Sequence, residues 1–157
     1  MKLNTLAQVL MMSGATLALS AAPGFAKHCQ DVGGGVLTNF LDATHTEGTV
    51  TGDFRGAIGV AVLGVTSGSN GTTIYHVQHH WVTDAGDTID LKDAYLSTFL
   101  TSDPNRVVAD YLNGVDLIGG TGRFDGATGS LSSVFGAVDL NKGQLTLRFE
   151  GRFCFPQ

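Results

Sequence analysis

Basic residues are scarce in this chain, with nine Lys and Arg against fourteen Asp and Glu and a formal net charge of −5. The few basic residues form no stripe, which argues against nucleic acid and anionic lipid as partners. After Ala26, no apolar run is long enough to cross a bilayer as a helix, so we expect no membrane insertion.

Cysteine is equally scarce, since only Cys29 and Cys154 are present. There is no Cys-x-x-Cys pair for redox chemistry and no cysteine cluster for zinc. Histidine does not replace it as a metal ligand. His76 and His80 share one face of a predicted strand but lie about 13 Å apart, and His79 points to the opposite face. We therefore expect no metal and no cofactor.

Residues 1–26 have the features of a cleavable signal peptide: a lone Lys2, an apolar stretch over 10–19, and small residues before a cleavage site after Ala26. A retained N-terminal anchor is the alternative. Cleavage would leave residues 27–157 as a single domain and, by removing Lys2, lower the net charge from −5 to −6. The prediction is a secreted or periplasmic protein.

An oxidising compartment of that kind would allow Cys29 and Cys154 to pair. The bridge would close a loop of about 125 residues, worth roughly 4–5 kcal/mol by loss of chain entropy in the unfolded state. We therefore predict a disulfide that pins an N-terminal arm to the last strand.

Glycine, by contrast, is concentrated in one segment, Gly-Gly-Thr-Gly-Arg-Phe-Asp-Gly-Ala-Thr-Gly over residues 119–129. A phosphate-binding loop would need a following helix and a Lys-Ser or Lys-Thr pair, whereas residues 130–140 are rich in β-formers. The segment is therefore predicted to be a tight connection between two strands. Its structural glycines are Gly119, Gly120, Gly122, Gly126 and Gly129.

The rest of the chain is predicted to be all-β, because β-rich segments are separated by turn sequences such as Asn141-Lys142-Gly143. Eight strands at this spacing suit a closed antiparallel barrel, which leaves no sheet edge exposed. The predicted strands are 36–41, 48–54, 57–66, 72–83, 88–98, 107–118, 130–140 and 144–155.

The glycine segment resembles the Gly-Gly-Thr-Gly-x-Phe-x-Gly-Ala-x-Gly signature of the allene oxide cyclase/dirigent barrel superfamily, including its secreted bacterial members. The resemblance is strongest over residues 87–155. It implies an eight-stranded antiparallel β-barrel around an apolar cavity, often assembled as a dimer or trimer. The signature glycines are structural in that superfamily, so the resemblance carries over no catalytic residue.

Strand alternation assigns the inward faces. On the last strand Leu145, Leu147 and Phe149 share the apolar side, which we assign to the barrel lumen. The inward set on strand 72–83 is Tyr75, Val77, His79 and Trp81. On strand 88–98 it is Ile89, Leu91, Asp93 and Tyr95, and further along the chain it includes Tyr111 and Asn113. A one-residue bulge within 72–83 would exchange His79 for His76 and His80.

An apolar lumen with a few polar groups is typical of a small-molecule site. The predicted function is binding of a small hydrophobic or aromatic molecule. The alternative is a cofactor-free isomerase or cyclase, or a dirigent-like stereocontrol protein, with Asp93, His79 and Tyr111 as acid–base candidates. A third reading, a barrel filled by side chains, would be favoured by a pocket below roughly 300 Å³. The predicted ligand-binding residues are Tyr75, His79, Trp81, Asp93, Tyr111 and Phe149.

The segment Ala57 to Val65 is apolar on both faces. In a single-layer barrel, its outer face would need a cover from the N-terminal arm or from another subunit. We therefore expect a homo-oligomer, a dimer or a trimer.

Overall fold

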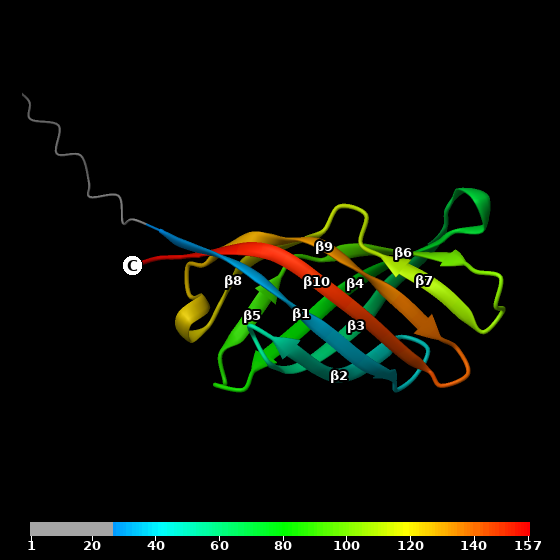
Figure 1. Cartoon of the computed structure of the whole chain (residues 1–157), viewed down its shortest axis with the longest axis horizontal. Helices are drawn as coiled ribbons and strands as arrows, with labels where there is room; N and C mark the ends of the chain where they lie inside the picture. Colours follow the sequence, from blue (N-terminus) through cyan, green and yellow to red (C-terminus); the bar gives the residue numbers. More distant parts are fainter. Residues whose placement is uncertain (1–26) are drawn as a thin grey trace, which may run out of the picture.

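The computed structural model describes residues 27–157, so the predicted signal peptide lies outside the described residues. Strands dominate this part of the chain (Figure 1). They are β1 His28–Phe40, β2 His45–Gly52, β3 Gly56–Ser67, β4 Thr73–Thr83, β5 Thr88–Leu91, β6 Ala94–Leu100, β7 Arg106–Asp110, β8 Val115–Gly120, β9 Thr128–Asp139 and β10 Gln144–Phe155.

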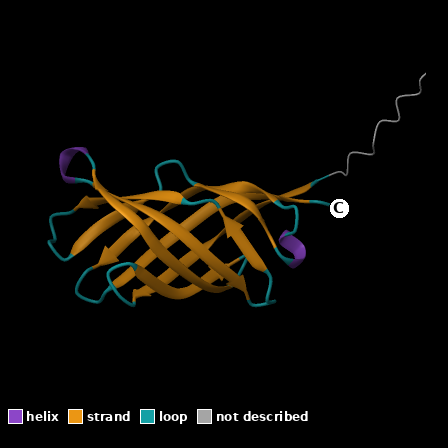
Figure 2. Ribbon diagram, turned by 180° about the vertical axis from the view of Figure 1, so that it is seen from behind, coloured by secondary structure: helices purple, strands orange, loops and turns teal. Residues whose placement is uncertain are grey.

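These strands form the closed, eight-stranded antiparallel barrel that the sequence predicts. Strand β4 pairs with both β5 and β6, so β5 and β6 together occupy one position in the barrel wall. Strand β9 likewise pairs with both β7 and β8, which together occupy another position. The other pairings follow the chain order, with β5 beside β8 and β6 beside β7, and β10 returns to β1 to close the wall. Figure 2 shows the strands curving around as a barrel wall, with short helical turns only in the connections.

The barrel closes at a seam between the first and the last strand, which run side by side in Figure 1. The register pairs His28 with Phe155 at one end and Asn39 with Gln144 at the other. Cys29 lies opposite Cys154 in this register, and the two form the predicted disulfide. The expected N-terminal arm is wrong in one respect, because the residues from His28 onward are part of β1 itself.

Two predicted strands are interrupted, because each carries one residue more than the strand beside it. Three residues separate Trp81 from Val77 on β4, whereas four separate their partners Ile89 and Ala94. An extra residue of this kind makes a β-bulge and shifts the alternation of inward and outward side chains. The predicted strand 88–98 is therefore divided into β5 and β6. The predicted strand 107–118 is likewise divided by the turn after Tyr111.

The glycine segment connects β8 to β9 through a short 3-10 turn, as predicted. Gly120 shows why glycine is needed there. Its φ is +153°, and a Cβ atom at this position would collide with the Thr88 carbonyl oxygen.

Aromatic side chains fill the lumen at the end of the barrel that holds this turn. The ring of Phe54 stacks on Phe153 at 5.4 Å and meets Phe124 edge-on at 5.1 Å. The guanidinium of Arg123 covers Phe54 at 4.8 Å from the ring centroid. The Trp81 indole N–H donates to the Phe54 carbonyl oxygen at 3.1 Å. This aromatic plug closes one end of the lumen.

The outer face of β3 is uncovered within the described residues, because β1 lies between β2 and β10 and not over β3. Ala57 is exposed there beside Val82 of β4, and Leu63, at a bulge of β3, is 49% exposed. Val65 is 56% exposed but pairs with Tyr75, so it lies on the lumen side at the end of the strand. Within residues 27–157, no helix combines the length and apolar composition that a membrane span requires.

Candidate functional site

The lumen holds two cavities, one above the other. The larger, which we call the cup, has a volume of about 200 Å³ and lies at the end of the barrel opposite the aromatic plug. The turn between β1 and β2 lies at its mouth, including Asp42 and Thr44. The smaller, the deep cavity, has a volume of about 30 Å³ and borders Trp81 and Phe149. Tyr111, Val60 and Leu145 line both cavities and form the partition between them.

Inward-facing side chains of most strands make the wall of the cup. The wall is mainly apolar, with hydroxyls from Thr46 and Thr98. Thr98 donates its hydroxyl to the Thr73 carbonyl at 3.3 Å, whereas the Oγ1 of Thr46 is buried without a hydrogen-bond partner. The apolar part of the wall includes Val62, Tyr75, Val77, Leu96, Val107 and Val138.

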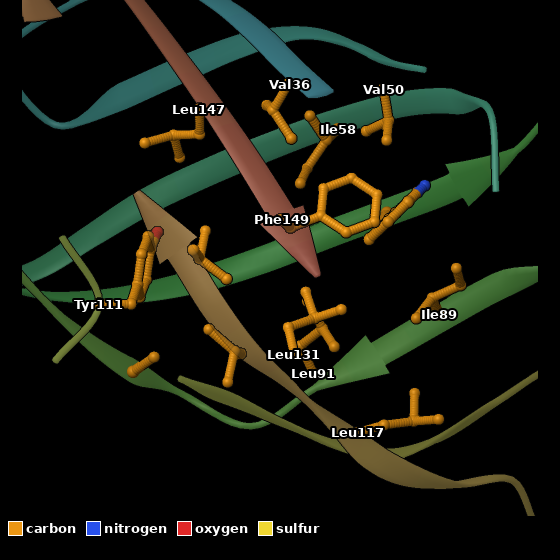
Figure 3. Packing of buried hydrophobic residues seen from close by; sticks show 14 of the residues in the cluster. Val36, Val50, Ile58, Ile89, Leu91, Tyr111, Leu117, Leu131, Leu147 and Phe149 are labelled. Carbon is orange, nitrogen blue, oxygen red and sulfur yellow. The ribbon is translucent and has the colours of Figure 1, made fainter. Parts of the chain in front are cut away.

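A hydrogen-bonded pair, His79 and Tyr111, occupies the middle of the lumen. Tyr111 follows β7, where its backbone N–H donates to the Val134 carbonyl and holds the residue against β9. Its hydroxyl lies 2.8 Å from Nε2 of His79 on β4. The Nδ1 atom of the same imidazole is buried and has no partner. Figure 3 shows the Tyr111 ring among the apolar side chains of the core.

Burial changes the acid–base properties of this pair. It lowers the pKa of His79 to about 4, although the negative charge of Asp93 acts in the opposite direction. Burial raises the pKa of Tyr111 above its ordinary value. Both groups are therefore neutral at pH 7, and the pair serves as a hydrogen-bonding element.

Asp93 does not belong to this site, and the prediction that it faces the lumen is wrong. It lies in the bulge between β5 and β6, where the alternation shifts, and its side chain is 39% exposed on the outside. Its carboxylate lies 3.7 Å from Nε2 of His76, and the His76 ring stacks on Tyr95 at 4.9 Å. The predicted inward positions of Tyr95 and Asn113 are wrong for the same reason, since both are exposed.

The other predicted site residues lie in the lumen but are divided between the two cavities. Tyr75 lines the cup, and Tyr111 borders both cavities. His79, Trp81 and Phe149 line only the deep cavity. The Trp81 and Phe149 rings meet edge-on at 5.5 Å, so they fill the core below the cup.

Two further residues of the lumen, Thr38 on β1 and Thr46 on β2, are polar side chains that face inward and were not predicted from the sequence. Thr38 is fully buried, and its Oγ1 has no hydrogen-bond partner. The signal was present in the alternation Val36, Thr38, Phe40, which places Thr38 on the apolar face of its strand. A threonine there is easily taken for an ordinary β-former.

The cup is smaller than a typical ligand pocket, since such pockets begin at about 300 Å³. It is larger than an engineered apolar cavity of about 150 Å³ that binds benzene in another protein. Its size suits one ring or a short chain. The aromatic plug and the Trp81 and Phe149 rings fill most of the lumen below the cup. This part of the lumen resembles the third prediction, a barrel filled by side chains.

No known family, curated protein or solved structure matches this chain. The resemblance of the glycine segment to the allene oxide cyclase/dirigent superfamily therefore stays a prediction. Across residues 27–157, no cluster of three or more His, Cys, Asp or Glu side chains is placed to hold a metal ion.

Proposed function

We propose that this protein binds a small hydrophobic molecule, no larger than a single ring with short substituents, in the cup. The observation that carries this proposal is a mainly apolar pocket of about 200 Å³ with an open mouth and a few polar groups in its wall. These groups include the Tyr111 hydroxyl at the base and the unpartnered Thr46 Oγ1 on the wall. Few polar groups in an apolar pocket is the usual composition of a small-molecule site.

Binding of toluene, followed by NMR of backbone amides, tests this function. We expect shifts at residues that line the cup, such as Val62, Leu96 and Val107. Replacing Val107 by Phe would fill the cup and abolish these shifts. The matched control is Val82→Phe, because Val82 lies on the outer face of β4 and is 43% exposed. The proposal fails if toluene near its solubility limit shifts no amide of the cup, or if Val107→Phe binds it as well as the native protein does.

The alternative is acid–base catalysis or dirigent-like stereocontrol in the same lumen. Less supports it, because the predicted His79–Asp93 pair is split by the barrel wall. The remaining pair, His79 and Tyr111, is also a poor proton donor and acceptor at pH 7, since burial moves each pKa away from neutrality. Conversion of a bound ligand, lost in Tyr111→Phe, would favour the alternative.

The proposed location is the periplasm or the extracellular space. The Cys29–Cys154 disulfide supports it, because such bonds persist mainly in oxidising compartments.

We also propose that a second copy of the chain covers the apolar outer face of β3, in a dimer or trimer. The exposed Leu63, and the exposed Ala57 beside Val82 of β4, support this assembly. Sedimentation equilibrium at micromolar concentration tests it, and a monomer alone would contradict it.

A further inference from the structure

The deep cavity brings together two buried polar atoms from distant strands. Thr38 on β1 and His79 on β4 both line it, although β2 and β3 separate their strands in the barrel wall. Thr38 Oγ1 and His79 Nδ1 are each fully buried, and neither has a hydrogen-bond partner. Buried polar atoms in native proteins are nearly always paired, so two orphans around one cavity call for a common partner.

The remaining wall of the deep cavity is apolar apart from the Trp81 ring and the Tyr111 hydroxyl. The Trp81 N–H is already used by the Phe54 carbonyl, and the Tyr111 hydroxyl is used by His79 Nε2. The partner of the two orphans must therefore come from outside the protein.

Size decides the nature of this partner. A volume of about 30 Å³ exceeds the 10–15 Å³ that a water molecule requires, and it is too small for an organic ligand. We propose that the deep cavity binds one ordered water molecule, held by Thr38 Oγ1 and His79 Nδ1. Internal waters of this kind commonly make two to four hydrogen bonds to buried polar groups.

A water molecule fits these partners because it can donate and accept. The neutral imidazole of His79 has one donor nitrogen and one acceptor nitrogen. Whichever role Nδ1 takes, the water takes the opposite one, and the Tyr111 hydroxyl does the same at Nε2. The result is a chain of hydrogen bonds from the base of the cup, through His79 and the water, to Thr38 on β1.

A crystal structure at a resolution that shows ordered solvent tests the proposal directly. We expect one density peak within about 3 Å of both Thr38 Oγ1 and His79 Nδ1. An empty deep cavity would overturn the proposal, and so would density there for an organic ligand.

The variant Thr38→Val gives a second test, because valine keeps the shape of threonine and removes its hydroxyl. If the water is present, the variant removes one of its two partners. The water is then held less well, His79 Nδ1 can lose its partner as well, and the Tm falls. If the cavity is dry, the variant removes an unpartnered hydroxyl, and the Tm rises, which would overturn the proposal. The control is Thr146→Val on the exposed side of β10, where we expect little change in Tm. Should Thr38→Val not fold, NMR cross-relaxation between water and the Thr38 methyl in the native protein decides, and no such signal would overturn the proposal.

Discussion

Acidification should destabilise this protein through a single buried imidazole. In the folded state the pKa of His79 is about 4, against 6.5 for an ordinary histidine. Between pH 6.5 and pH 4 the unfolded chain therefore binds a proton at His79 that the folded protein does not bind. Because the free energy of unfolding rises with pH wherever the unfolded state holds more protons, it must fall as pH is lowered through this window.

The size of the effect follows from the shift. A difference of about 2.5 pKa units, at 1.36 kcal/mol per unit, corresponds to about 3 kcal/mol of lost stability at pH 4 relative to pH 7. The carboxyl of Asp42 titrates at lower pH than this window. Hydrogen bonds from Thr44 and His45 lower its pKa to about 2, so its stabilising contribution is lost only below about pH 4.

The assay is urea unfolding at half-unit steps from pH 7.5 to pH 4, with His79→Gln as the comparison. The native protein should lose stability mainly below pH 6.5, and the variant should show a much flatter dependence. The variant is expected to be less stable at pH 7, because Tyr111 loses its partner, so the slope with pH is the decisive quantity. An equal slope in both proteins would refute the assignment of a buried neutral imidazole.

Three further predictions concern other parts of the barrel. Replacing Cys29 and Cys154 by Ala should lower stability by up to about 4–5 kcal/mol, measured by urea unfolding, and an unchanged midpoint would contradict the role of the disulfide. Gly120→Ala should be strongly destabilising in thermal unfolding, because the new Cβ would collide with the backbone of Thr88. Gly86→Ala should cost only about 1–2 kcal/mol, since the φ of Gly86, +89°, is strained for alanine but the space around it is open. Above pH 10, stability should fall because unfolded tyrosine ionises before Tyr111 does in the fold, and Tyr111→Phe should reduce this fall in urea unfolding at pH 8 to 11.

Local patterns were sufficient to predict the barrel. The strict alternation of β10 identifies its buried side, and Leu145, Leu147 and Phe149 are all buried. The glycine segment marks the β8–β9 connection, since all five of its glycines have positive φ. Both signals depend on neighbouring residues along the chain, and a single sequence therefore contains them.

The candidate site could be predicted only in part, because it depends on register between strands. One extra residue between Ile89 and Ala94 is invisible in the sequence, yet it moves Asp93 from the lumen to the outside. The division of the lumen is equally nonlocal. Trp81 and Phe149 meet from different strands and fill space that alternation alone assigns to a ligand. Alternation predicts which side chains face inward, and packing decides how much room they leave.

The seam between β1 and β10 has a consequence for how the barrel folds. Cys29 and Cys154 are 125 residues apart, so the first strand is made long before the partner that completes its second edge. Until then, β1 can pair only with β2, and its other row of backbone N–H and C=O groups is open to pairing with another chain. Contacts of such high sequence separation form slowly, because a long loop must be closed first. The barrel therefore acquires its final, edge-free form only when β10 reaches β1, and the disulfide then makes that last step hard to reverse.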